Sequence, residues 1–132
     1  MGIVDTHTHA DHISSAAILK KKYGVPLYMS DRAVSSIATK RLNDCDVIKV
    51  GDTEVETIYT PGHTDDSISL LTGHGDLFTG DVLLINSVGR MDFQNGSPED
   101  MFDSLDNLAN LPEETVIRPA HDYKGNLIST IA

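Results

Sequence analysis

The chain has 132 residues, with 20 acidic and 10 basic side chains and a formal net charge of −10 at pH 7. Hydrophobic residues make up 39% and charged residues 23%, which is typical of one globular domain over residues 1–132 and excludes a disordered chain. No apolar run approaches the roughly 18 residues of a membrane span, and the acidic charge disfavours nucleic acid and anionic membranes as partners. The single cysteine, Cys45, cannot form an intramolecular disulfide, so we expect a cytoplasmic setting.

The first third of the chain predicts a β-α-β unit. A short apolar run at residues 3–5 predicts a strand, and apolar residues recur at helical spacing over residues 14–23. Gly24 follows this periodic stretch and predicts its C-terminal end. Residues 27–29 predict the next strand, and residues 31–40 predict a second, weaker helix.

The middle of the chain predicts antiparallel strands. Two apolar segments, residues 47–50 and 55–59, flank Gly51-Asp52 and predict a hairpin. Residues 67–71 and 77–79 predict two more strands, joined by a glycine-containing turn.

A helix and a strand are predicted near the C-terminus. Ser97 as the cap and Pro98 in the first turn predict a helix that runs to about Leu108. Residues 116–117 predict a last buried strand. Strands mixed with helices, with polar clusters at the strand ends, indicate an α/β sheet protein.

The strongest chemical signal is a cluster of histidines near the N-terminus. The pattern H-x-H-x-D-H at residues 7–12 places four potential metal ligands within six residues: His7, His9, Asp11 and His12. In an extended stretch His7 and His9 project to the same side, so both imidazoles can reach one metal ion. Asp11 and His12 lie where the chain turns into the next helix and could reach a second ion. Solvated histidines in a polar loop rarely show this spacing, so the pattern favours divalent metals.

Three later segments add candidate ligands. Each places a His or an Asp directly after a predicted strand, beside a Gly or Pro that lets the backbone turn sharply. The three candidates are His63, Asp81 and His121. Each of them alone is more often a structural histidine or a turn residue, but together with residues 7–12 they predict a metal centre.

This ordered series resembles the ligand series of the metallo-β-lactamase superfamily over nearly the whole chain. The resemblance implies an α/β fold, an αβ/βα sandwich with the metal site at one edge of its two sheets. It implies one site of His7, His9 and His63, and another of Asp11, His12 and His121, with Asp81 bridging the two.

Within the superfamily, residues 61–65, 89–94 and 119–125 are similar to those of persulfide dioxygenases. That family oxidises glutathione persulfide with oxygen to sulfite and glutathione. The resemblance implies one Fe(II) per chain and a small thiol-derived substrate. The catalytic ligands it implies are His7, His63 and Asp81, a triad that leaves three coordination positions open.

Two further positions match family residues near the glutathione moiety. The resemblance implies that Arg90 and Tyr123 bind substrate, with Arg90 pairing with a substrate carboxylate. The alternatives are a surface or ion-paired arginine and a tyrosine packed in the core.

Two other functions are compatible with the same ligands. One is a glyoxalase II-like thioester hydrolase that holds one or two Zn(II) ions per chain. In such an enzyme the metal activates a hydroxide for attack on the thioester. The other is a metal-binding chain without activity. The Gly-Arg-x-Asp-Phe-Gln segment at residues 89–94 favours the dioxygenase.

The chain is short relative to the family at both ends. Family members carry several strands before H-x-H-x-D-H, whereas six residues precede His7 here. We therefore expect a reduced sandwich with the N-terminal strands missing, and a homodimer in which each copy covers the other's exposed sheet. Outside the ligand motifs, Cys45 lies between Asp44 and Asp46, whose carboxylates disfavour its thiolate.

Overall fold

The computed structural model describes residues 1–10, 12–123, 125 and 128–132. The helices are α1 (Ala16–Tyr23) and α2 (Pro98–Ala109). The strands are β1 (Ile3–Val4), β2 (Leu27–Ser30), β3 (Lys40–Leu42), β4 (Val47–Val50), β5 (Thr53–Tyr59), β6 (Ile68–Thr72), β7 (Asp76–Gly80), β8 (Leu83–Leu84), β9 (Ser87–Val88), β10 (Val116–Pro119) and β11 (Ser129–Thr130). No helix in the described part of the chain is long and apolar enough to cross a membrane.

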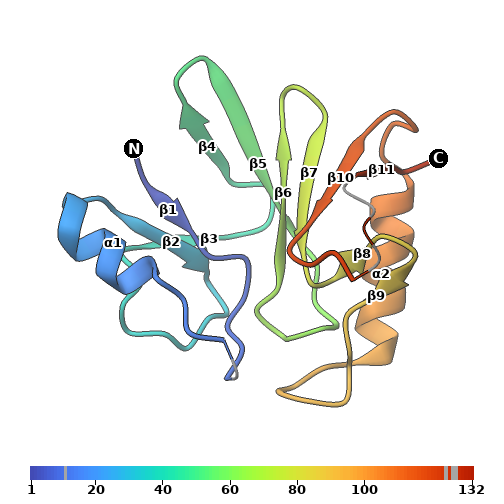
Figure 1. Ribbon diagram of the computed structural model, residues 1–132, viewed down its shortest axis with the longest axis horizontal. Coiled ribbons are helices and arrows are strands. Elements are labelled where there is room, and N and C mark those ends of the chain that lie inside the picture. Colours follow the sequence, from blue (N-terminus) through green and yellow to red (C-terminus); the bar gives the residue numbers. More distant parts are fainter. Residues whose placement is uncertain (11, 124, 126–127) are drawn as a thin grey trace.

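Most strands belong to two sheets that pack face to face (Figure 1). The small sheet has the parallel order β1-β2-β3, and the large sheet has the mixed order β11-β10-β7-β6-β5-β4. Helix α1 lies on the outer side of the small sheet, and α2 lies at the opposite side of the molecule beside the large sheet (Figure 1). This arrangement is the αβ/βα sandwich expected from the sequence, and the predicted fold class is confirmed.

The predicted β-α-β unit is confirmed. Strands β1 and β2 are parallel neighbours connected through α1. Gly24 ends the helix in a left-handed conformation, with φ 63°, and its N–H donates to the carbonyl of Lys20. Glycine adopts this conformation without a steric penalty, which is why the helix ends at this residue.

The helix predicted over residues 31–40 is wrong. This stretch is irregular until β3, and Val34, which would belong to the apolar face, is 96% exposed. The guanidinium of Arg41 donates to the carbonyls of Ala33 and Ser35, which a helix would need for its own hydrogen bonds. Pairing of β3 with β2 holds Arg41 in this position.

The remaining predicted strands and the second helix are present. Strands β4 and β5 form the predicted hairpin, with Gly51 at φ 63° in its turn. Strands β6 and β7 are antiparallel, and β10 pairs in parallel with β7. The hydroxyl of Ser97 accepts from the Asp100 N–H and Pro98 is the first residue of α2, as predicted.

The core between the two sheets fixes how the layers meet. Leu42 of the small sheet and Ile68 and Leu70 of the large sheet are buried against each other. Helix α2 packs directly against the loop after β5, because a Cβ on Gly62 would lie 2.5 Å from the Cα of Met101. The Ser104 hydroxyl also donates to the Pro61 carbonyl, at 2.7 Å. The loop that carries His63 is therefore held against α2.

Candidate metal centre

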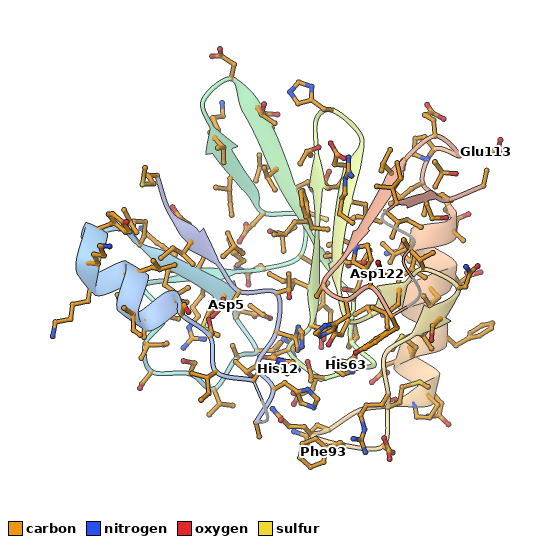
Figure 2. All side chains as sticks on the ribbon, viewed as in Figure 1. Asp5, His12, His63, Phe93, Glu113 and Asp122 are labelled. Atoms are coloured by element: carbon orange, nitrogen blue, oxygen red, sulfur yellow. The ribbon has the colours of Figure 1, made fainter. Side chains whose placement is uncertain are left out.

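The candidate ligands gather because the strands before them end at the same edge. Strands β5 and β7 are both antiparallel to β6 and so run in the same direction, and β10 runs parallel to β7. His63, Asp81 and His121 follow the C-terminal ends of these three strands. Strand β1 of the small sheet leads into the loop that carries His7, His9 and His12. Figure 2 shows His12 and His63 at this edge, on loops from different sheets.

The side chains form two groups of three potential metal ligands. In each group, one ligand atom per residue lies within 4.8 Å of the others. The first group is His7, His9 and His63, and the second is His12, Asp81 and His121. Asp11, expected in the second group, lies outside the described residues. The structure thus brings together the other six predicted ligands, and their binding of a metal stays a prediction.

Asp81 lies between the two groups. Its Oδ2 is 3.8 Å from Nε2 of His7, 3.7 Å from Nε2 of His63 and 3.3 Å from Nε2 of His121. A carboxylate in this place can contact an ion in either group. The distances therefore suit the bridging position that the resemblance implies for Asp81.

The burial of these ligands fits a metal ion. His63 is 3% exposed and Asp81 is 7% exposed. His63 Nε2 and Asp81 Oδ1 are buried and have no hydrogen-bond partner among the described residues. Polar atoms in this situation are costly unless an ion or water satisfies them. Two such atoms on neighbouring candidate ligands fit a site for a metal ion.

The tautomer of His63 is set by its neighbour. His63 Nδ1 lies 2.8 Å from the carbonyl oxygen of Arg90, which can only accept a hydrogen bond. Nδ1 therefore carries the proton, and the lone pair of Nε2 faces Asp81 and the metal position. This is the usual arrangement of a metal-binding imidazole.

His7 is held in its neutral form. Burial, reinforced by the nearby His63, lowers the pKa of His7 from 6.5 to about 4. Thr6 Oγ1 lies 3.1 Å from Nδ1 of the same ring. Because only the neutral imidazole has a lone pair for a metal, His7 is ready to bind one at neutral pH.

Asp66 is a buried residue that the sequence analysis missed. Its carboxylate accepts from the Thr8 N–H at 3.1 and 3.2 Å and from the Thr8 hydroxyl at 2.6 Å. It also accepts from the Thr64 hydroxyl, at 2.7 Å. Asp66 thus ties the loop of His7 and His9 to the loop of His63. No local sequence signal indicates this role, because Thr8 lies 58 positions away.

Arg90 and Tyr123 line one cavity beside the ligands. The cavity has a volume of about 210 Å³, and its wall includes His9, His63 and Asp81. Arg90 makes a two-bond ion pair with Asp92, at 2.8 and 3.0 Å, so the ion-paired alternative holds in this structure. The role of Arg90 and Tyr123 in binding substrate stays a prediction.

The core-packing alternative for Tyr123 is wrong. The residue is 75% exposed. Its ring stacks on the His121 ring, with the centroids 5.5 Å apart. Tyr123 is therefore a surface aromatic at the mouth of the site.

A second cavity also borders the loop that carries His7, His9 and His12. Its volume is about 330 Å³, and its wall includes Asp5, Met29 and Ile37 together with His7 and His12. Burial raises the pKa of the Asp5 carboxyl, an effect that a hydrogen bond from Ser14 partly offsets. Two cavities thus border the candidate ligands.

Known proteins resemble this chain in sequence and in fold. Residues 2–121 match the sequence model of the metallo-β-lactamase superfamily. The chain is 37% identical over 130 residues to the mitochondrial persulfide dioxygenase ETHE1 of Homo sapiens, covering 97% of this chain and 51% of that protein. It is 39% identical over 125 residues to a hydroxyacylglutathione hydrolase of Hahella chejuensis, covering 92% of this chain and 48% of that protein.

A solved structure shows the same fold at higher identity. The crystal structure of ETHE1 from Myxococcus xanthus superposes with a TM-score of 0.94 and 42% sequence identity, covering 98% of this chain and 57% of that chain. The chain spans about half the length of the curated relatives it matches.

Proposed function

Because the chain belongs to the metallo-β-lactamase superfamily, we propose that it is a metalloenzyme that oxidises a low-molecular-weight persulfide, such as glutathione persulfide, to sulfite. One persulfide, one oxygen molecule and one water give one thiol and one sulfite. The observation that carries the proposal is the likeness to the persulfide dioxygenases of Homo sapiens and Myxococcus xanthus along nearly the whole chain.

In this proposal His7, His63 and Asp81 hold one Fe(II) per chain, and a bound ferrous ion supplies the redox chemistry with oxygen. His7 serves as a neutral ligand because its pKa is lowered to about 4. His63 presents Nε2 because its Nδ1 donates to the Arg90 carbonyl. His63 and Asp81 are buried, so these two ligands are shielded from bulk solvent.

The cavity beside Arg90 and Tyr123 is the proposed place of the thiol carrier. The guanidinium of Arg90 would exchange Asp92 for a carboxylate of the substrate, a pairing of the same geometry. The exposed ring of Tyr123 would cover one side of the bound carrier.

The homodimer and the cytoplasmic location expected from the sequence stay predictions.

A thioester hydrolase is the second candidate, and a specific observation favours it. Two groups of three ligands are present, with Asp81 between them, and such a pair suits two Zn(II) ions that activate one hydroxide. The likeness to the hydroxyacylglutathione hydrolase of Hahella chejuensis points the same way. A metal-binding chain without activity is the third candidate.

Two parallel assays separate the three candidates. The metal-free chain is loaded with Fe(II) without oxygen, and oxygen uptake and sulfite are then measured with glutathione persulfide. We expect equal amounts of oxygen consumed and sulfite formed, and neither from the Asp81→Ala chain, which lacks the central carboxylate.

Lactoylglutathione is tested in parallel with the Zn(II)-loaded chain. Its hydrolysis, with no oxygen uptake from the persulfide, would replace the dioxygenase proposal by the hydrolase. Turnover of neither substrate by a metal-loaded, folded chain would leave the inactive metal-binding chain.

A further inference from the structure

Gln94 holds the backbone on both sides of His9. Its side-chain Oε1 accepts from the Ala10 N–H at 2.7 Å, and its Nε2 donates to the Thr8 carbonyl at 2.6 Å. An amide can make this pair of bonds because it carries one acceptor and one donor group, whereas a carboxylate can only accept. The loop that presents His9 is therefore clamped by one side chain from a distant part of the chain.

The residues before Gln94 contact the same centre. Gly89 passes so close to His63 and the Asp81 carbonyl that a Cβ at this position would overlap both. The carbonyl of Arg90 accepts from Nδ1 of His63. The ring of Phe93 packs on the ring of His9, with centroids 5.4 Å apart, and Phe93 lies at the outer edge of the site in Figure 2.

These contacts explain a segment that the metal ligands alone leave unexplained. Residues 89–94 supply none of the predicted ligands, yet they contact the loops of His9, His63 and Asp81. The order of residues in the segment follows from these contacts. Gly89, which has no side chain, lies against His63. The ring of Phe93 packs on His9, and the amide of Gln94 bonds the backbone on either side of His9.

We propose that Gln94 is a positioning residue of the metal centre, which sets the place of His9 relative to His7 and His63 by fixing Thr8 and Ala10. The inference rests on metal binding by the group of His7, His9 and His63, which shares His7 and His63 with the proposed function, and not on the persulfide reaction. When the clamp is removed, Thr8 keeps its bonds to Asp66, but residues 9–10 gain conformational freedom, and metal binding must then order them. Loss of such a supporting contact typically lowers metal affinity about 10-fold to 100-fold.

The test uses Co(II) as the probe, titrated into the metal-free full chain and followed by visible absorption. Gln94→Met keeps the size of the side chain and removes both hydrogen bonds. We expect it to bind Co(II) about 10-fold more weakly, with an altered absorption spectrum that reports a changed ligand arrangement. Gln94→Glu keeps the acceptor for Ala10 but loses the donor to Thr8. Its Co(II) affinity should therefore fall between that of the parental chain and that of Gln94→Met.

Asn95→Gly is the matched control on the same loop. It removes the bond from Asn95 Nδ2 to Asp65 and leaves the contacts of Thr8 and Ala10 untouched. Asn95 has φ 61°, which glycine adopts easily. This variant should keep the parental Co(II) affinity and spectrum. Circular dichroism and the melting temperature of each metal-free variant show that it is folded.

Several outcomes would overturn the inference. Gln94→Met with parental affinity and spectrum would do so, even if its melting temperature fell, because Gln94 would then only stabilise the fold. An equal loss in Asn95→Gly would assign the effect to the loop as a whole. If Gln94→Met does not fold, Gln94→Glu decides by the same criteria. Absence of oxygen uptake has no bearing on these titrations, so the proposed reaction can fail while the role of Gln94 stands.

Discussion

Replacing Asp66 by alanine should destabilise the metal-free protein. Asp66 is 1% exposed, and its carboxylate joins the loop after β1 to the loop after β5. The substitution removes the acceptor for the N–H and hydroxyl of Thr8. Thr64 keeps a partner, because its hydroxyl also lies 2.7 Å from that of Ser67. The loss is therefore concentrated on Thr8.

The size of the effect follows from the two bonds of Thr8. A hydrogen bond to a charged group contributes about 1.5–3 kcal/mol, so losing two at the lower figure costs about 3 kcal/mol. For a chain of this length, that loss lowers the melting temperature by about 10 °C. Asp66→Asn keeps one acceptor oxygen and should cost about 1–2 kcal/mol.

Urea unfolding followed by circular dichroism measures these differences, and the adjacent Asp65 provides the control. Asp65 is exposed and accepts from Asn95 Nδ2, so Asp65→Ala should cost no more than about 0.5 kcal/mol. A loss for Asp66→Ala below about 1 kcal/mol, or equal to that of Asp65→Ala, would refute the reasoning.

Two further predictions concern residues away from the metal centre. Ser97→Ala removes the acceptor for the Asp100 N–H and should lower the free energy of unfolding by about 1 kcal/mol, while Ser97→Asp keeps it; equal melting temperatures for all three chains would contradict this. The carboxylate of Asp44 raises the pKa of the exposed Cys45 thiol, so less thiolate is present at a given pH than for a free cysteine. Alkylation by iodoacetamide should therefore have a pH midpoint above that of free cysteine, and Asp44→Asn should lower it; an unchanged midpoint in the variant would count against the assignment.

Elements with local signals were predictable from the sequence. The cap and proline of α2 and the Gly51 turn each act within a few residues. Strand β3 was missed, and a helix was expected before it, because Lys40–Leu42 forms a strand only by pairing with β2. The two-residue strands β8, β9 and β11 also depend on pairing partners and carry no pattern of their own.

The distinction between local signals and contacts of distant residues also applies to the candidate site. The histidines of residues 7–12 were found from their spacing, and the later ligands were found because each follows a predicted strand. Asp66 and Gln94 were not found, because their partners lie 58 and 84–86 positions away in the sequence. Nothing near Gln94 in the sequence shows that it contacts the loop of His9. Supporting residues of this kind become visible only when the tertiary structure is known.

The position of the candidate ligands on both sheets also has a consequence for folding. His7, His9 and His12 belong to the loop after the first strand of the small sheet, while His63 and Asp81 follow strands of the large sheet. An ion held by both sets would cross-link the two layers at their shared edge. Because the ligands extend from residue 7 to residue 121, the complete set exists only after β10 has paired with β7. A metal that binds this set and not the unfolded chain would stabilise the sandwich by about 2.7 kcal/mol at a concentration 100-fold above its dissociation constant. The metal concentration would then affect the stability of the folded sandwich as well as the reactivity of the site.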